Sequence, residues 1–342
     1  MSRELDRSPS TASMTGQIIR LDRIQNPYGP VDRIMDAVSH FDEWWSRLDD
    51  PAAELKRQLG ARAGVGGDWI VLANGIDELQ AMIAQWRSAR PLVLFSPGDP
   101  FLEGWLQRFV AQVEILPRTR DFALPIAPGR SSLPQGATTV VMSPNDPTGT
   151  VTTVQEAVRL SRQSSLVVID ERHGAYSPRT LLPLVREFEN LVLLQTFETF
   201  ASLTAFPLAW AIAPPRIAAE IAAFTRPSGI ADASIVAGLA ALEADADIKA
   251  TVRQVMVEKG RLFRQLRKLS MISPPYPSWA NFLLARIERG SSEFFVPRLA
   301  QKGIYVHEVK LPRLANHLRI SAVSLETTYA LKHALIEIAL DL

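Results

Sequence analysis

The stretch TTVVMSPNDPTGTVTTVQEAVRLSRQSSLVVIDERH, residues 138–173, decides the fold of this chain. Its first and last apolar runs, TTVVMS and SLVVID, have the length of strands and are apolar on both faces, as in a buried parallel sheet. Between them lies a helical segment, 153–163, for which Thr153 or Thr152 is a suitable N-cap. This order of elements favours an α/β sheet with helices on both faces.

The same alternation extends along the chain. Strands are expected at 69–73, 91–96, 113–117, 138–143, 165–170 and 191–197, with helices that include 76–88, 101–111 and 153–163. After about residue 214 the pattern changes to consecutive helices and then to an α+β ending, with strand-like runs at 281–287, 304–309 and 317–323. We therefore predict a large α/β domain with a mostly parallel sheet sandwiched by helices, plus a smaller α+β domain.

The length of 342 residues is too great for one small domain. The expected divisions are a disordered tail at 1–15, an N-terminal arm joining the small domain at 16–45, a large domain at 46–240 and a small C-terminal domain at 241–342. The tail lacks the apolar core of a signal peptide, and the apolar runs are too short to span a bilayer, so a cytoplasmic location is expected.

Composition excludes several classes of function. The formal net charge is +1 without a long run of Lys or Arg, so neither nucleic acid nor an anionic membrane is an expected partner. The absence of cysteine excludes disulfides, thiolate metal sites and a cysteine nucleophile.

Seven short motifs follow one another between about residues 24 and 340. They are NPYGP at 26–30, NGIDEL at 74–79, PFLEGW at 100–105, SPNDPTG at 143–149, DERH at 170–173, NFLL at 281–284 and LRIS at 318–321. In this order and spacing they resemble the pyridoxal-phosphate-dependent aminotransferases of fold type I, nearest to the histidinol-phosphate aminotransferases. The resemblance implies the fold type I architecture, with the small domain built from both chain ends, and a dimer with shared active sites.

The resemblance also implies where the family's cofactor would lie. Gly75, Ile76 and Asp77 open the helix whose N-terminus receives the cofactor phosphate, and free N–H groups there favour an anion. Trp105 stands where an aromatic ring stacks on the pyridine ring, and Asp170 where a carboxylate pairs with the pyridine nitrogen. For the substrate, Asn26 and Tyr28 match the N-terminal substrate loop. Arg319 matches the arginine that grips the α-carboxylate with a two-pronged contact.

The pattern breaks at the residue on which the family's chemistry depends. The Schiff-base lysine aligns with Thr199, and no lysine occurs between Lys56 and Lys249. Threonine forms no imine and cannot act as the amine base that moves the substrate proton. A serine on the phosphate side is replaced by Glu198, and the phosphate-gripping arginine by Pro207.

Three further differences accompany these. The Asn and Tyr that hold the 3′ oxygen of the cofactor become Asp146 and His173, and a tyrosine expected near Leu48 is absent. Each charge-assisted hydrogen bond contributes roughly 1.5–3 kcal/mol, so several such contributions are lost at once. We therefore expect no cofactor, with pyridoxal phosphate improbable.

Four ionisable residues, Asp146, Asp170, His173 and Glu198, are expected around one cleft, because ligands bind at the carboxyl edge of an open α/β sheet. With Thr199 they are the candidate catalytic residues, suited to acid–base work or to a hard metal, although no metal ligand is assigned. Burying them requires an offset: protonation, a bound cation, a charged His173, or a nearby arginine such as Arg172. The competing interpretations are structural roles: core packing for His173 and Trp105, and an ion pair for Arg319.

Three functions remain open. The first is a re-tooled, cofactor-independent enzyme acting on a small amino acid or related carboxylate held by Arg319. The second is a non-catalytic partner or ligand-sensing subunit, in a homodimer or in a heterodimer with a lysine-bearing relative. The third is an aminotransferase with a displaced lysine, for which Lys249 is the nearest candidate.

Overall fold

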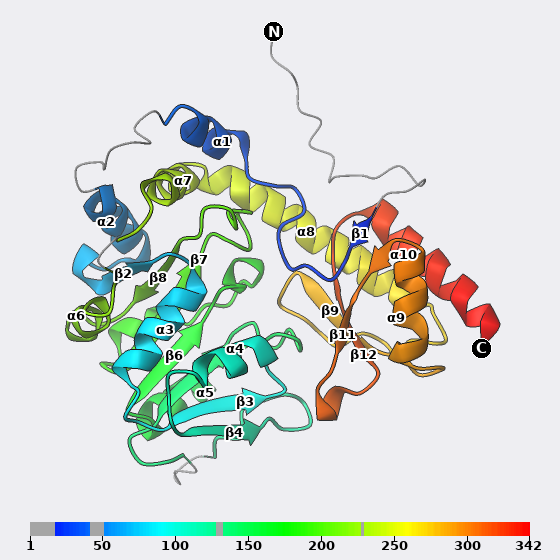
Figure 1. Cartoon of the computed structure of the whole chain (residues 1–342), viewed down its shortest axis with the longest axis horizontal. Helices are drawn as coiled ribbons and strands as arrows, with labels where there is room; N and C mark the ends of the chain where they lie inside the picture. The colour runs from blue at the N-terminus through cyan, green and yellow to red at the C-terminus, as the bar shows by residue number, and fades with distance from the viewer. Residues whose placement is uncertain (1–17, 42–50, 128–132, 227–228) are drawn as a thin grey trace.

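The computed structural model describes residues 18–41, 51–127, 133–226 and 229–342 (Figure 1). The predicted tail at 1–15 and the position near Leu48 lie outside these ranges. The centre of the larger lobe is a seven-stranded sheet with the strand order β2-β8-β7-β6-β5-β3-β4. Its strands are β2 Ile70–Ala73, β3 Leu92–Ser96, β4 Val113–Pro117, β5 Thr138–Met142, β6 Leu166–Asp170, β7 Leu191–Thr196 and β8 Ala209–Ile212.

The sheet is mostly parallel, as predicted. Strands β4, β3, β5, β6 and β7 run parallel to one another, whereas β8 is antiparallel to both β7 and β2. Alternate residues of each strand enter two different apolar cores, one on each face. In β6, Val167 and Ile169 pack into one core and Leu166 and Val168 into the other. This is why the strands are apolar throughout.

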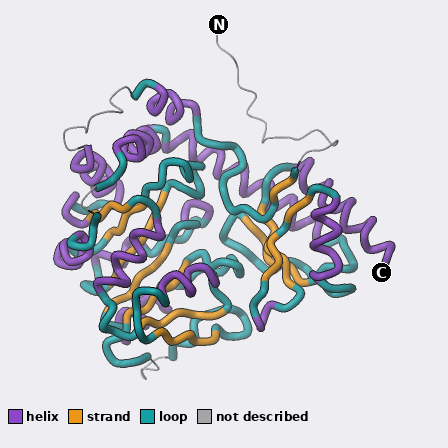
Figure 2. The backbone as a smooth tube through the Cα atoms, in the orientation of Figure 1, coloured by secondary structure: helices purple, strands orange, loops and turns teal. Residues whose placement is uncertain are grey.

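Helices cover both faces of this sheet (Figures 1 and 2). They are α2 Pro51–Ala63, α3 Ile76–Trp86, α4 Pro100–Leu106, α5 Val154–Gln163, α6 Pro215–Ala222 and α7 Asp232–Glu243, with α1 Asp32–Ser39 packed on α7. Thr153, one of the two predicted N-caps, closes a capping box on α5 with Glu156. The predicted helix 101–111 ends earlier, at Leu106, because 107–109 form turns.

The smaller lobe contains the antiparallel sheet β11-β12-β9, with β9 Phe282–Arg286, β11 His307–Val309 and β12 His317–Ser321. Helices α8 Asp245–Leu266, α9 Ser292–Gln301 and α10 Leu325–Ile338 accompany it. The single strand predicted at 304–309 is divided into β10 Ile304–Tyr305 and β11, because Val306 makes no ladder contact. Strand β1, Ile19–Arg20, pairs with β10, so the N-terminal segment packs against the C-terminal part of the chain. The domain boundaries themselves stay predictions.

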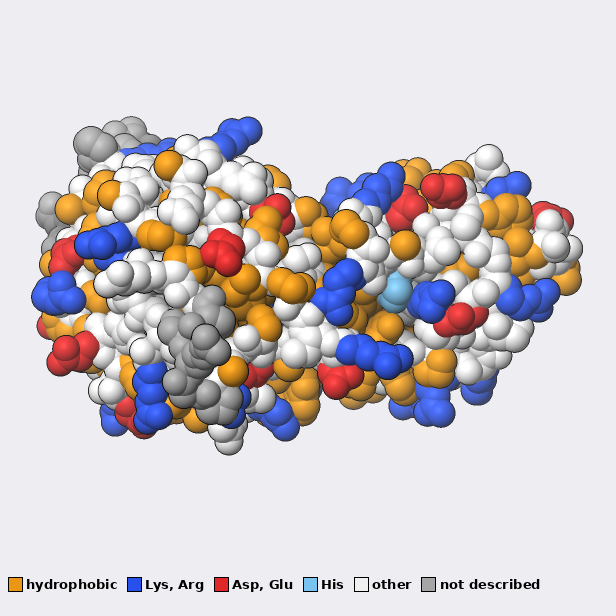
Figure 3. All heavy atoms as spheres, turned by 90° about the horizontal axis from the view of Figure 1, so that it is seen from below, with side chains coloured by type: hydrophobic (Ala, Val, Ile, Leu, Met, Phe, Trp, Pro, Cys, Tyr) orange, Lys and Arg blue, Asp and Glu red, His pale blue; other side chains and the backbone are white. Residues whose placement is uncertain are grey.

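Charges are mixed on the surface. On the face seen in Figure 3, Lys and Arg side chains are interspersed with Asp, Glu and apolar groups, and a notch separates the two lobes. Within the described ranges, no helix combines the length and the apolar character that a bilayer crossing requires.

Candidate functional site

The site lies where β5, β6 and β7 end. Met142, the last residue of β5, pairs with Asp170, and Asp170 pairs with Leu194 near the end of β7, so the three carboxyl ends meet at one edge. The turn after β5 carries Asp146, and the turn after β7 carries Glu198. The turns that carry Asp146 and Glu198 therefore follow neighbouring strands of the sheet, on either side of the strand that ends at Asp170.

Asp170 is completely buried and is held by three donors. Gln80 Nε2 donates to its Oδ2 at 2.7 Å, Arg172 Nε donates to the same oxygen at 2.9 Å, and the Arg172 backbone N–H donates to Oδ1 at 3.0 Å. Burial alone would lower the pKa of Arg172, but the charge and hydrogen bond of Asp170 outweigh it and raise that pKa. For Asp170, a nearby arginine therefore supplies the compensating charge.

The Arg172 guanidinium also faces the first turn of α3. Its Nη1 lies 3.9 Å from Asp77 Oδ1, while Nη2 lies 2.7 Å from Asp170 Oδ2. One buried guanidinium therefore extends from the end of β6 to the N-terminus of α3. The same turn of α3 accepts Trp105, whose Nε1 donates to the Asp77 carbonyl oxygen at 3.0 Å.

Glu198 occupies the anion position at this helix N-terminus. Its Oε1 accepts the Ile76 backbone N–H at 3.2 Å and the Thr196 hydroxyl at 3.1 Å. Gly75 has φ +90°, and a Cβ there would lie 3.0 Å from Glu198 Oε1, so both its backbone and the carboxylate favour glycine. Burial raises the pKa of Glu198 although these hydrogen bonds oppose the rise.

Thr199 contacts the same arginine through the backbone. Its hydroxyl donates to the Arg172 carbonyl oxygen at 2.5 Å, and its own carbonyl oxygen accepts the Asn26 backbone N–H at 2.8 Å. The lysine nearest in sequence, Lys249, lies on α8 with its side chain 60% exposed and ion-paired to Asp245 at 2.6 Å. It is therefore directed to solvent.

Asp146 forms a buried ion pair with Arg319. The carboxylate belongs to the turn after β5 of the large sheet, and the guanidinium belongs to β12 of the small sheet. Arg319 Nη2 also donates to the Asp22 carbonyl oxygen at 2.8 Å, and its guanidinium lies 5.6 Å from the centre of the Phe282 ring. The ion pair thus ties the two lobes together at the site.

His173 is 1% exposed and packs edge-on against Phe282, with 5.9 Å between ring centres. Burial lowers the pKa of His173 to about 4, so the imidazole is neutral at pH 7. Its Nδ1 has no hydrogen-bond partner in the described part of the chain. A charged His173 is therefore not the offset for the neighbouring carboxylates.

Asn26 and Tyr28 lie next to the site, and both side chains are hydrogen-bonded to other residues of the chain. The buried Asn26 amide donates to the Phe200 carbonyl oxygen and the Thr251 hydroxyl, each at 2.8 Å. Tyr28 is half-buried, and burial raises the pKa of its hydroxyl, which is hydrogen-bonded to Gln254 on α8.

Two site residues escaped the sequence reasoning. Gln80 lies on α3, four residues after Ile76, and its side chain contacts Asp170. In the sequence, the one feature that pointed to Gln80 was a polar residue on an otherwise apolar helix face. Asp99 caps α4 by accepting the Phe101 N–H at 2.9 Å, and burial and Asp146 raise its pKa.

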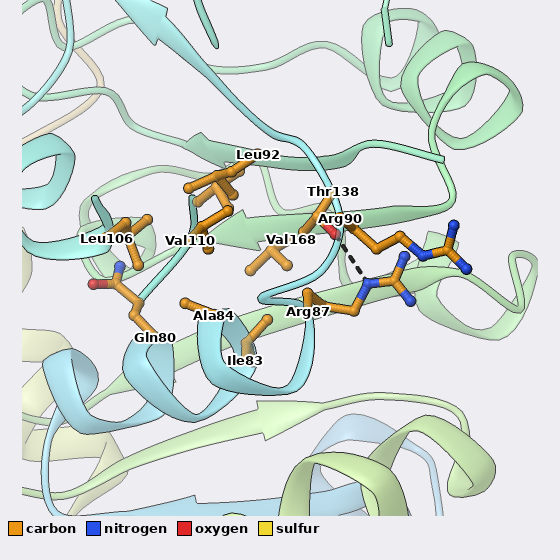
Figure 4. A pocket seen from close by; sticks show the side chains of 11 residues that line it. Gln80, Ile83, Ala84, Arg87, Arg90, Leu92, Leu106, Val110, Thr138 and Val168 are labelled. Carbon is orange, nitrogen blue, oxygen red and sulfur yellow. Dashed lines mark hydrogen bonds between the residues drawn. The ribbon is translucent and has the colours of Figure 1, made fainter. Parts of the chain in front are cut away.

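A pocket lies between α3 and the sheet, with Gln80 at one end and Arg87 and Arg90 at the other (Figure 4). Its remaining lining is mainly apolar, and Arg87 Nε donates to the Thr138 hydroxyl at 3.0 Å. Among the described residues, no group of three or more His, Asp or Glu side chains is arranged to hold a metal ion.

Known proteins resemble this chain over nearly its whole length. The histidinol-phosphate aminotransferase of Dehalococcoides mccartyi strain BAV1 is 26% identical over 339 residues, covering 96% of this chain and 92% of that protein. The solved histidinol-phosphate aminotransferase of Sinorhizobium meliloti, in complex with pyridoxal-5′-phosphate, has a TM-score of 0.84 at 22% identity, covering 95% of this chain and 92% of that one. A putative histidinol-phosphate aminotransferase from Erwinia carotovora also has a TM-score of 0.84, at 20% identity and with 95% and 96% covered.

These findings correct one expectation. We expected no cofactor, but similar proteins are histidinol-phosphate aminotransferases and one was solved with pyridoxal-5′-phosphate. The expectation rested on the changed residues at the phosphate and imine positions, Glu198, Pro207 and Thr199. It did not take into account the residues that remain for the rest of the cofactor site. Asp170, Trp105 and the N-terminus of α3 are all present and assembled here.

The family assignment rests on a match over most of the chain. The family model described as aminotransferase class I and II matches residues 131–337, which include the turn with Asp146, the end of β6, Glu198 and Arg319. The large sheet and its flanking helices agree with the fold of the similar structures. This chain belongs to the class I and II aminotransferase family.

Proposed function

We propose that this chain is a non-transaminating member of its family, a ligand-binding subunit of an aminotransferase-type dimer. The observation that carries the proposal is the position of Arg172. Its buried guanidinium pairs with Asp170 and faces Asp77, so it lies between the two points that the family uses for the ring nitrogen and for the phosphate. Thr199, at the position expected for the lysine, is hydrogen-bonded to the backbone of the same residue.

The residues present fit the family's cofactor only in part. When bound, that cofactor supplies an aldehyde and an electron-accepting ring. In this chain Asp170 and Trp105 suit the ring, but Thr199 offers no amine and Glu198 places a carboxylate at the phosphate position. The site therefore does not fit a covalently attached cofactor, and a cofactor entering here has to exchange with Arg172 and Glu198.

The acid–base alternative has less support. General acid–base catalysis requires a group that is free to exchange a proton near the operating pH. Asp170 and Asp146 are each paired with an arginine, and the imidazole of His173 is neutral and buried. The displaced-lysine alternative is disfavoured too, because Lys249 is exposed on α8.

The test is a transamination assay of the purified protein with pyridoxal phosphate, a panel of amino acids and 2-oxoglutarate, with product acids separated by chromatography. We expect no turnover above that of free pyridoxal phosphate. Borohydride treatment should attach no cofactor to residues 190–210. Turnover that survives removal of free cofactor by gel filtration, or a borohydride adduct in that segment, would refute the proposal.

The dimer and its ligand are part of the same proposal. The ligand is expected to be a small amino-acid-like molecule or carboxylate, and the partner either a second copy or a lysine-bearing relative. The support is the family membership together with the buried arginine at β12, a guanidinium suited to a carboxylate that lies between the lobes.

A further inference from the structure

The pocket between α3 and the sheet has a basic end, an apolar middle and a polar inner end (Figure 4). Arg87 and Arg90 lie at the basic end, and Gln80 lies at the inner end. Apolar side chains line the middle, among them Ile83 of α3 and Leu106 of α4. Among the described residues that line the pocket, none is acidic. An apolar space with a few polar groups at its ends is typical of a site for a small ligand, and the sign of the charge here favours an anion.

The two arginines have no carboxylate partner. Arg87 donates from Nε to the Thr138 hydroxyl at 3.0 Å and from Nη2 to the Ser165 hydroxyl at 2.5 Å, and both acceptors are uncharged. Arg90 is exposed, and neither arginine forms an ion pair within the described ranges of the chain. Burial and the charge of Arg90 lower the pKa of Arg87. A carboxylate bound between them would therefore be favourable to both guanidinium groups.

Gln80 supplies a free acceptor at the inner end. It is 3% exposed, and its Nε2 donates to Asp170 Oδ2 at 2.7 Å, whereas its Oε1 accepts no hydrogen bond from a described residue. A buried polar atom in this situation indicates a missing hydrogen-bond donor. Gln80 lies within α3 and Arg87 is the C-cap of the same helix, so the two ends lie about 10 Å apart along the helix axis.

We propose that this pocket is a ligand site, and that its ligand is an unbranched aliphatic carboxylate with a hydroxyl group at the far end. The carboxylate binds Arg87 and Arg90, the chain lies on the apolar residues, and the hydroxyl donates to Gln80 Oε1. The pocket is narrow, which favours a single chain over a ring. Because Gln80 also holds Asp170, one side chain connects this pocket to the candidate functional site.

The experiment compares matched compounds by calorimetry with the full-length protein. They are 8-hydroxyoctanoate, 1,8-octanediol, octanoate and 4-hydroxybutyrate. We expect 8-hydroxyoctanoate to bind about tenfold more tightly than the diol, which lacks the carboxylate, and about fivefold more tightly than octanoate, which leaves Gln80 Oε1 without a donor. It should bind about tenfold more tightly than 4-hydroxybutyrate, whose shorter chain buries less apolar surface and does not extend to both ends.

Three variants locate the binding. Arg90→Glu should weaken the binding of 8-hydroxyoctanoate about tenfold or more, because it places a negative charge beside the carboxylate. Arg289→Glu makes the same change at an exposed arginine of the smaller lobe and is the matched control, which should bind as the parent does. Gln80→Leu removes the acceptor, so the advantage of 8-hydroxyoctanoate over octanoate should disappear.

If Gln80→Leu fails to fold, the comparison of octanoate with 8-hydroxyoctanoate on the parent decides the role of Gln80. Equal binding of these two compounds by the parent would overturn that role. The ligand site itself would be overturned if the parent binds none of the compounds, if the diol binds as tightly as the hydroxy acid, or if Arg90→Glu and Arg289→Glu weaken binding equally. The inference does not depend on the proposed function, whose failure appears as turnover in the transamination assay.

Discussion

Replacement of Arg172 by alanine tests the central observation directly. The change leaves Asp170, which is 0% exposed, without its ion-pair partner. Removing one partner of a buried pair costs about 3–5 kcal/mol. Two donors to Asp170 remain, the Gln80 amide and the backbone N–H of residue 172, so we expect the lower end, about 3 kcal/mol.

Urea unfolding followed by fluorescence and circular dichroism is the assay. A loss of this size should lower the transition midpoint by up to about 1 M, because the slope for a chain of this length is at least about 3 kcal/mol per M. Arg216→Ala, which removes an exposed i,i+4 pair with Glu220, is the control and should change stability by less than about 0.5 kcal/mol.

A double-mutant cycle identifies the partner. If Arg172 stabilises the fold through Asp170, then Arg172→Ala should cost much less in an Asp170→Asn background, with a coupling energy of about 2–3 kcal/mol. A loss below about 1 kcal/mol for Arg172→Ala, or additive effects in the cycle, would refute the assignment of Arg172 to the buried pair.

Four further predictions follow from the same site. Thr199→Lys alone should show no aldimine absorbance band when pyridoxal phosphate is added, whereas the triple variant Arg172→Ala/Glu198→Ser/Thr199→Lys should show one. A band in the single variant would mean that Arg172 and Glu198 do not prevent the cofactor from binding covalently. Glu198→Ser should make sulfate or phosphate raise the melting temperature, because the Ile76 N–H is freed for an anion, and equal protection of the parent would contradict this. Burial raises the pKa of Glu198 above its unfolded value, so the proton it binds stabilises the folded parent at low pH, and that contribution is lost as the pH rises. The stability of the parent relative to Glu198→Gln should therefore fall with rising pH. A stability difference that stays constant with pH would count against this burial effect. Sizing with light scattering should give a dimer of this chain or, when the chain is mixed with a lysine-bearing relative, a heterodimer, and a persistent monomer in both experiments would oppose the subunit proposal.

The sequence predicted most of the fold because its strands carry a strong local signal. Strands such as β6 are β-branched and apolar on both faces, and their residues divide between two cores as a buried parallel strand requires. Strand β8 was missed because Ala209–Ile212 is short, rich in alanine and preceded by Pro207 and followed by Pro214. Its placement is decided by pairing with β2 and β7, which no local pattern reveals.

The sequence indicated which strand ends carry the candidate site residues, but it did not indicate which charged side chains form ion pairs with each other. The rule that ligands bind at the carboxyl edge of the sheet places Asp146, Asp170 and Glu198 together. Which charge meets which depends on side-chain conformations and on contacts across the chain. Arg172 is two residues from its partner, whereas Arg319 is 173 residues from Asp146, and a sequence alone distinguishes neither pair from a solvated charge.

The three pairings have a common logic. In the family pattern, the ligands would bring a phosphate to the N-terminus of α3, a ring nitrogen to Asp170 and a carboxylate to Arg319. Here Glu198, Arg172 and Asp146 supply one charge of the matching sign at each of these points. Because charge at each point is balanced from within the chain, the site does not depend on a ligand for its stability. The three residues are consistent with one another, since each supplies a charge of the sign that one part of the family's ligands would bring. Under the proposed function, a ligand that enters the site competes with side chains of the protein for each of these contacts. Such competition weakens binding, and we therefore expect ligand binding at this site to depend on how easily the three ion contacts open.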